Sequence, residues 1–97
     1  MPYFIKTETI KRHYLSEIDF KIKTIKEHKS WVKKLIDKGF YIKSGFLVDK
    51  EQVPGAGGLL IIECESFEEA EKIIKDDPMI QNNIVDCKLY EWINIVQ

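Results

Sequence analysis

Arginine, excess charge of either sign and long apolar runs are all scarce in this sequence. Arg12 is the only arginine, and the 15 lysines and arginines are balanced by 16 acidic residues, giving a net charge of -1. Without a global positive field, a nucleic-acid partner is not expected. No apolar run approaches the roughly 20 residues of a membrane span, and the N-terminus lacks a signal-peptide pattern. We therefore expect a cytoplasmic location and no membrane partner.

Cysteine is also scarce. Cys64 and Cys87 lie in apolar, strand-like segments and lack the spacing of metal ligands. We interpret them as two buried thiols rather than as a disulfide or a metal site. An iron–sulfur cluster needs four ligands, so that chemistry is excluded and no metal is expected.

The composition is that of an ordinary globular protein. Hydrophobic residues make up 44% of the 97 residues and charged residues 32%. A chain of this length forms one core, so residues 1–97 are expected to be a single domain.

Apolar periodicity and turn residues divide the chain into four strands and two helices. Gly39 is expected to end the first helix, and Ser66 to Glu69 form a capping box that begins the second. Pro78 is expected to end that helix. The predicted order is strand 3–10, helix 16–38, strand 40–48, loop 49–57, strand 58–64, helix from 66, and strand 85–96.

This βαββαβ order predicts an α+β fold in which right-handed crossovers place both helices on one face of an antiparallel sheet. Strand 58–64 is nevertheless apolar on both faces, because it contains the run Leu59 to Ile62. If this face stayed uncovered, it would expose a larger apolar area than monomers usually do. We therefore predict a homodimer through the open sheet face, with binding of another partner or a ligand there as the competing explanation.

Two titratable residues occupy inward helical positions. His28 stands three residues after Ile25 and three before Trp31, so its imidazole is predicted to face the sheet. Asp77 stands three residues after Ile74 and is predicted to lie inward on the last turn of its helix, where its charge opposes the helix dipole. A histidine beside a carboxylate is the usual construction of a general base, although a core histidine and a turn aspartate would explain the same residues.

Six short motifs carry a family resemblance that spans roughly residues 3 to 95. They are His28 to Trp31 as HxxW, the following Gly39, Ser44-Gly45, Gly57-Gly58, the Ser66 to Ala70 helix start and Asp77-Pro78. In these motifs and their order the chain resembles the YCII-related family.

The resemblance implies a ferredoxin-like dimeric α+β barrel, with a four-stranded antiparallel sheet and two helices on one face. It also implies that His28 and Asp77 form the active pair for cofactor-independent proton transfer on a small organic compound, since the family includes a dehydrochlorinase of a chlorinated aromatic diol. Trp31, Tyr41 and Ser44 are predicted to line the substrate pocket, with plain packing as the alternative for each. The chain departs from the family pattern in its long segment 12–23 and in Phe46, which stands where a proline commonly follows the glycine.

Other functions remain open on the same fold. A non-catalytic dimeric module for ligand binding or stress is one alternative, and an antibiotic-biosynthesis-type monooxygenase is another. RNA binding is disfavoured because strand 58–64 lacks stacking aromatics, and an acylphosphatase because nothing glycine-rich surrounds Arg12. His13 is expected to be solvated in a charged loop, with a place at the pocket rim as the alternative. An enzyme requires His28 and Asp77 at a solvent-reachable pocket, whereas a scaffold would bury them.

Overall fold

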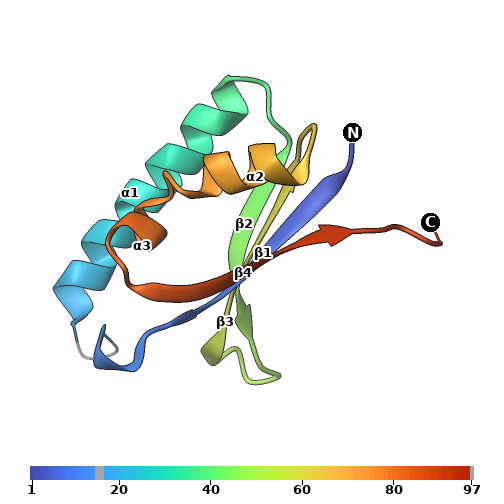
Figure 1. The fold of residues 1–97 in the computed structure, drawn as a ribbon. Helices are drawn as coiled ribbons and strands as arrows, with labels where there is room; N and C mark the ends of the chain where they lie inside the picture. The colour runs from blue at the N-terminus through green and yellow to red at the C-terminus, as the bar shows by residue number, and fades with distance from the viewer. Residues whose placement is uncertain (15–16, 97) are drawn as a thin grey trace.

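The computed structural model describes residues 1–14 and 17–96 and has the ferredoxin-like βαββαβ fold (Figure 1). A single 3-10 turn, Arg12–Tyr14, follows the first strand. The other elements are β1 (Tyr3–Ile10), α1 (Ile18–Asp37), β2 (Ile42–Val48), β3 (Pro54–Glu63), α2 (Phe67–Ile74), α3 (Pro78–Gln81) and β4 (Val85–Trp92).

The four strands form one antiparallel sheet in the order β2-β3-β1-β4, and the helices lie on one of its faces (Figure 1). The register pairs Phe4 with Ile62 and Lys6 with Leu60 across the two central strands. Because side chains alternate along a strand, this register places these four residues on the helix-covered face. The predicted fold class is confirmed.

The hydrophobic core lies between that face and the helices. Its fully buried members come from the two central strands, from Cys64 after β3, from Ala70 on α2 and from Ile84 before β4. Cys87 is exposed, so the prediction of two buried thiols is wrong for this residue. Cys87 lies on β4, which is an edge strand of the sheet, and the helices do not cover its side chain.

Helix α1 ends as predicted but buries less of its apolar stripe than predicted. Gly39 has φ +99°, and the amides of Gly39 and Phe40 donate to the carbonyls of Ile36 and Leu35, which is a Schellman motif. Leu35 is buried, whereas Ile18 and Ile22 are 61% and 52% exposed. The first turns of α1 lie at the edge of the molecule, where the sheet offers less surface to pack on (Figure 1). The predicted start at Ser16 lies outside the described residues.

Helix α2 begins at the predicted cap and ends earlier than predicted. The Ser66 hydroxyl accepts a hydrogen bond from the Glu69 amide at 3.1 Å. The helix ends at Ile74, and Pro78 starts α3 instead of ending α2. Proline suits the first position of a helix because the amide it lacks would have no intrahelical partner there. Asp77 therefore precedes a helix, and the predicted conflict with a helix dipole is wrong.

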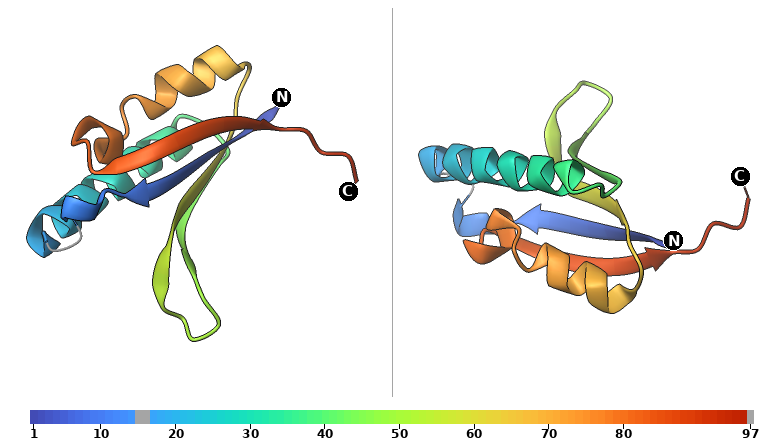
Figure 2. Two further views of the ribbon diagram at one scale, coloured as in Figure 1. Left: turned by 60° about the horizontal axis from the view of Figure 1, so that its bottom comes forward. Right: turned by 90° about the horizontal axis from the view of Figure 1, so that it is seen from above.

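Strand β3 of the hairpin is longer than predicted, because it begins at Pro54, four residues before the expected start. The loop between β2 and β3 is correspondingly shorter than the predicted loop 49–57. This hairpin and the chain after β4 both extend away from the body of the fold (Figure 2). None of the helices among the described residues is both long enough and apolar enough to span a membrane.

On the second face of the sheet, the described residues include no covering helix (Figure 2). The register places Ile5, Ile61 and Tyr90 side by side on this face. Tyr3 contacts both Tyr41 and Trp92, with ring centroids 5.9 and 6.1 Å apart. The open face is therefore apolar and aromatic, as predicted from the sequence.

Candidate active site

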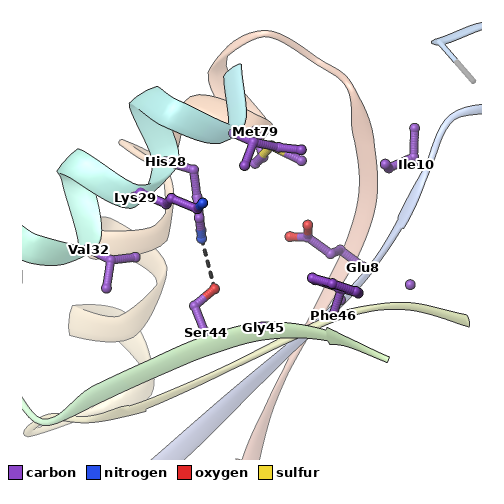
Figure 3. Close-up of a pocket in the computed structure, with 12 residues that line it drawn as sticks. Glu8, Ile10, His28, Lys29, Val32, Ser44, Gly45, Phe46 and Met79 are labelled. Carbon is purple, nitrogen blue, oxygen red and sulfur yellow. Dashed lines mark hydrogen bonds between the residues drawn. The ribbon is translucent and has the colours of Figure 1, made fainter. Parts of the chain in front are cut away.

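His28 projects from α1 toward β2 at the mouth of a pocket (Figure 3). Its side chain is 14% exposed, and its Nε2 lies 2.8 Å from the Ser44 hydroxyl oxygen. The helical spacing that predicted an inward-facing imidazole is thus confirmed. Solvent can reach the ring through the pocket, while the backbone of α1 fixes its direction.

Asp77 lies behind His28 and is completely buried. Its Oδ1 accepts a hydrogen bond from the Met79 amide at 2.9 Å, which caps α3, and lies 2.7 Å from Nδ1 of His28. Burial by itself raises the pKa of the Asp77 carboxyl, but the hydrogen bond with His28 and the charge of Lys6 outweigh it and hold that pKa below its usual range. Asp77 is therefore a carboxylate.

Lys6, on β1, is a further residue of this site because it contacts Asp77. Sequence reasoning did not identify it. Its side chain is only 1% exposed, and its Nζ forms an ion pair with Oδ2 of Asp77 and another, at 2.7 Å, with Oε1 of Glu8. Burial alone would lower the pKa of Lys6, but the two carboxylates raise it above its usual value. The period-two alternation of strand 3–10 puts Lys6 on the same side as Phe4, and that was the one available signal.

This chain of contacts determines which nitrogen of the imidazole is basic. A carboxylate only accepts hydrogen bonds, so Nδ1 of His28 must donate to Asp77. In the neutral ring Nε2 then carries the lone pair, and the Ser44 hydroxyl donates to it. The basic nitrogen of His28 therefore points to Ser44 and the pocket, and Asp77 is placed to stabilise the imidazolium.

The pocket has a volume of about 270 Å³ and lies between α1, the start of α3 and the sheet. Gly45, Gly57 and Gly58 leave one wall free of side chains. Apolar contacts come from Ile10, Ile25, Val32, Phe46 and Met79, and polar groups from Glu8, His28, Lys29 and Ser44 (Figure 3). A small compound with an apolar body and a few polar substituents fits this lining.

The structure brings together three of the five residues predicted for the site, namely His28, Asp77 and Ser44. The Trp31 ring lies beside His28, with centroids 5.7 Å apart, but it lines a separate groove between α1 and α2. Tyr41 lies with Tyr3 on the far side of the sheet. Substrate contact by Trp31 and Tyr41 stays a prediction that this pocket does not support. The side chain of His13 lies outside the described part of the chain.

Comparisons with known proteins agree with this fold. The model of the YCII-related domain matches residues 1–93. No curated protein matches the sequence. Among solved structures, the chain is similar to 5-chloro-2-hydroxyhydroquinone dehydrochlorinase (TftG) from Burkholderia phenoliruptrix AC1100 in complex with 2,5-dihydroxybenzoquinone, with 16% identity over 93% of this chain and 92% of that chain and a TM-score of 0.64.

A de novo designed protein, Ferredog-Diesel, matches with 13% identity over 93% of this chain and 84% of that chain, and a TM-score of 0.58. Because a natural enzyme and a designed protein are both similar at this level, these likenesses report the fold and do not specify a reaction. The family model is a sequence match and covers nearly the whole chain. The chain therefore belongs to the YCII-related family.

Proposed function

We propose that this protein is an enzyme in which His28, oriented by Asp77, transfers a proton on a small organic ring compound without a cofactor. The observation that carries the proposal is the Asp77–His28–Ser44 chain, with contacts of 2.7 and 2.8 Å, at a solvent-reachable pocket. A histidine kept only for packing would not need its basic nitrogen turned to a pocket. A buried carboxylate with a lowered pKa is the partner that stabilises a transient imidazolium.

The chemistry follows from these positions. A substrate displaces the Ser44 hydroxyl from Nε2 of His28, and Nε2 takes a proton from the substrate. The electron pair left behind either forms a new double bond as a leaving group departs or moves along the ring and is protonated elsewhere. These outcomes are eliminations and isomerisations, and both return His28 to its neutral form when the proton is released.

The pocket supports a ring-sized substrate with polar substituents. Its walls are apolar, its volume is close to the lower end of small-molecule sites, and the Lys29 ammonium lies at its edge, where it favours an anionic group. TftG is described in complex with 2,5-dihydroxybenzoquinone. That compound is therefore a suitable probe for this chain.

We also propose that the protein works as a homodimer through the open face of the sheet. Tyr41, Tyr90 and Trp92 are each about half exposed on this face, at 47%, 50% and 48%. A second copy would cover them, and burial of apolar surface contributes roughly 25 cal/mol per Å² before the costs of association.

The proposal is tested with two compounds. Chloride release from 5-chloro-2-hydroxyhydroquinone measures turnover, and calorimetry with 2,5-dihydroxybenzoquinone measures binding. His28→Ala should lower turnover by about 100-fold or more, the usual contribution of a general base. Lys33→Ala, at an exposed position on the same helix, should leave it unchanged.

The His28→Ala variant should still fold, because Asp77 keeps Lys6 and the Met79 amide as partners. Its stability should remain within about 1 kcal/mol of the wild type. Tight binding without turnover would instead support the ligand-binding module. If neither compound binds, this class of ring compound is the wrong substrate class.

A further inference from the structure

We propose that Glu8 selects the substrate, because its carboxylate accepts a hydrogen bond from a hydroxyl group on the ring compound that His28 deprotonates. This inference rests on the proposed function, since it names the substituent that the same pocket recognises. Glu8 belongs to β1, whereas His28 belongs to α1, so the two residues approach the pocket from different elements. Neither composition nor spacing in the sequence singled Glu8 out.

The Glu8 side chain lies in the wall of the pocket and not on the outer surface. It is only 13% exposed, and it faces the space that His28 and Ser44 face from the other side (Figure 3). Alternation along β1 puts Glu8 on the helix-covered face with Phe4 and Lys6. A ring bound between α1 and the sheet therefore has His28 on one side and the Glu8 carboxylate on the other.

Glu8 is an ionised group that only accepts hydrogen bonds. Its Oε1 lies 2.7 Å from Nζ of Lys6, and this ion pair keeps the group a carboxylate. A carboxylate has about four acceptor positions on its two oxygens, and the contact with Lys6 uses one of them. An acceptor so shielded from water is stabilised by a ligand that donates to it. A hydroxyl substituent is such a donor.

Lys6 also holds the carboxylate in place. The Lys6 side chain is 1% exposed and pairs with Asp77 as well, the residue that orients His28. The recognition group and the base are thus held by contacts of one buried cation. A ligand does not have to order the Glu8 side chain when it binds, and such preorganisation raises affinity and specificity.

Gly58 of β3 leaves the room that the Glu8 carboxylate occupies. It is the register partner of Glu8, and a Cβ at this position would lie 3.1 Å from Cγ and 3.2 Å from Oε2 of Glu8. Both distances are shorter than ordinary van der Waals contact. Even an alanine at position 58 would push the carboxylate aside, so the glycine allows Glu8 to lie against the pocket.

The other polar side chains of the pocket wall do not duplicate this acceptor. Lys29 is a cation and only donates, and the Ser44 hydroxyl lies 2.8 Å from Nε2 of His28. Nε2 itself takes the proton in the proposed reaction. Among the described residues that line the pocket, Glu8 is the one carboxylate. Glu8 therefore suits a neutral hydroxyl group, whereas Lys29 suits an anionic one.

The first test uses the wild-type protein and two neutral rings of similar size. Resorcinol carries two hydroxyl groups, and meta-difluorobenzene carries none. Each ring is titrated into the full-length protein while NMR follows the side-chain carboxyl carbon of Glu8. Resorcinol should shift this resonance until the site is saturated, because it donates to the carboxylate, and meta-difluorobenzene should shift it much less. Resorcinol that binds without a shift at Glu8, or does not bind at all, would overturn the inference.

The second test compares the affinities of both rings for Glu8→Gln. The amide oxygen of the glutamine stays with Lys6, so its NH2 group, a donor, replaces the acceptor in the pocket. Resorcinol should bind about 10-fold or more weakly, the usual effect of losing a hydrogen bond to a charged group, and meta-difluorobenzene should bind as before. Glu91→Gln, an exposed carboxylate of β4, is the matched control and should change neither affinity.

An equal loss for both rings would mean that Glu8 only maintains the shape of the pocket, and an unchanged resorcinol affinity would mean that Glu8 recognises nothing. Either result rejects the inference, and if Glu8→Gln does not fold, the wild-type titration decides. Selective loss of resorcinol binding, without chloride release from 5-chloro-2-hydroxyhydroquinone by the wild type, would uphold Glu8 and count against the proposed function. Chloride release together with resorcinol binding that ignores Glu8→Gln would uphold the proposed function and reject Glu8 as the selecting residue.

Discussion

Lys6 and Asp77, 71 positions apart in the sequence, form an ion pair that is almost completely shielded from solvent. The strand that carries Lys6 is the first element of the fold, and Asp77 precedes the last helix. Their contact ties the centre of the sheet to the start of α3. It also keeps Asp77 ionised beside His28, so one interaction supports both the fold and the site.

Loss of this pair should cost much of the stability of so small a protein. Lys6→Met removes the ammonium and leaves two carboxylates with less compensation, which should lower the free energy of unfolding by about 3 kcal/mol. Urea denaturation followed by circular dichroism measures this. Lys88→Met, on an exposed position of β4, is the control and should change stability by less than about 0.5 kcal/mol. A similar small loss for both variants would mean that the buried pair contributes little.

The lowered pKa of Asp77 makes the stability of the protein depend on pH in the acidic range. An aspartate in an unfolded chain has a pKa of about 3.9, so the folded protein binds fewer protons at this site. The contribution of Asp77 is therefore fully present above about pH 3.9 and is lost as the pH falls through the lower folded-state pKa. Asp77→Asn should flatten the acid limb of a stability-against-pH curve, whatever its effect at pH 7. An unchanged acid limb would show that other carboxyls dominate.

Lys6 should produce the opposite dependence at alkaline pH. Its folded-state pKa is raised, so its contribution is complete below the unfolded value of about 10.4 and is lost as the pH rises through the folded-state pKa. Thermal denaturation at pH 10, 11 and 12 measures the fall. Lys6→Met should reduce the slope of this fall in stability. A parallel fall in the wild type and in Lys6→Met would mean that other groups cause it.

Adjacent residues of β3 should separate folding from assembly. Leu60 is 1% exposed and faces the helices, whereas Ile61 faces the open side of the sheet. Leu60→Asp should therefore prevent folding, because it buries an unpaired charge. Ile61→Asp should remain folded but turn the dimer into a monomer, as measured by light scattering and circular dichroism. A folded Ile61→Asp dimer, or a monomeric wild type at micromolar concentration, would contradict an interface on this face.

Substitution of single glycines should have graded effects. Gly57 has φ +90° and a backbone carbonyl 2.1 Å from the position of a Cβ, so Gly57→Ala should destabilise the protein by about 2 kcal/mol or more. A Cβ on Gly45 would meet nothing within 4 Å, and Gly45→Ala should be nearly neutral. Differential scanning calorimetry on the two variants compares them. Equal stabilities would show that β3 shifts easily at Gly57.

Local signals in the sequence were sufficient for the elements and for one half of the site. Ser66 with Glu69 and Gly39 after the first helix specify helix ends through contacts within a few residues. The spacing of His28 relative to Trp31 specified the direction of the imidazole for the same reason. Asp77 was harder, because an aspartate before a proline occurs both where one helix ends and where the next begins. The choice depended on where α2 stopped.

The environment of the charged residues was decided only by the tertiary structure. The strand 3–10 alternates Phe4, Lys6 and Glu8 with Tyr3, Ile5 and Thr7, and each set contains apolar residues, so alternation alone does not show which set faces the helices. Pairing with β3 made that choice, and it buried Lys6 between Asp77 and Glu8. Short-range propensities placed the strands and helices, whereas contacts between distant segments made a buried charge cluster out of residues that look solvent-facing in the sequence.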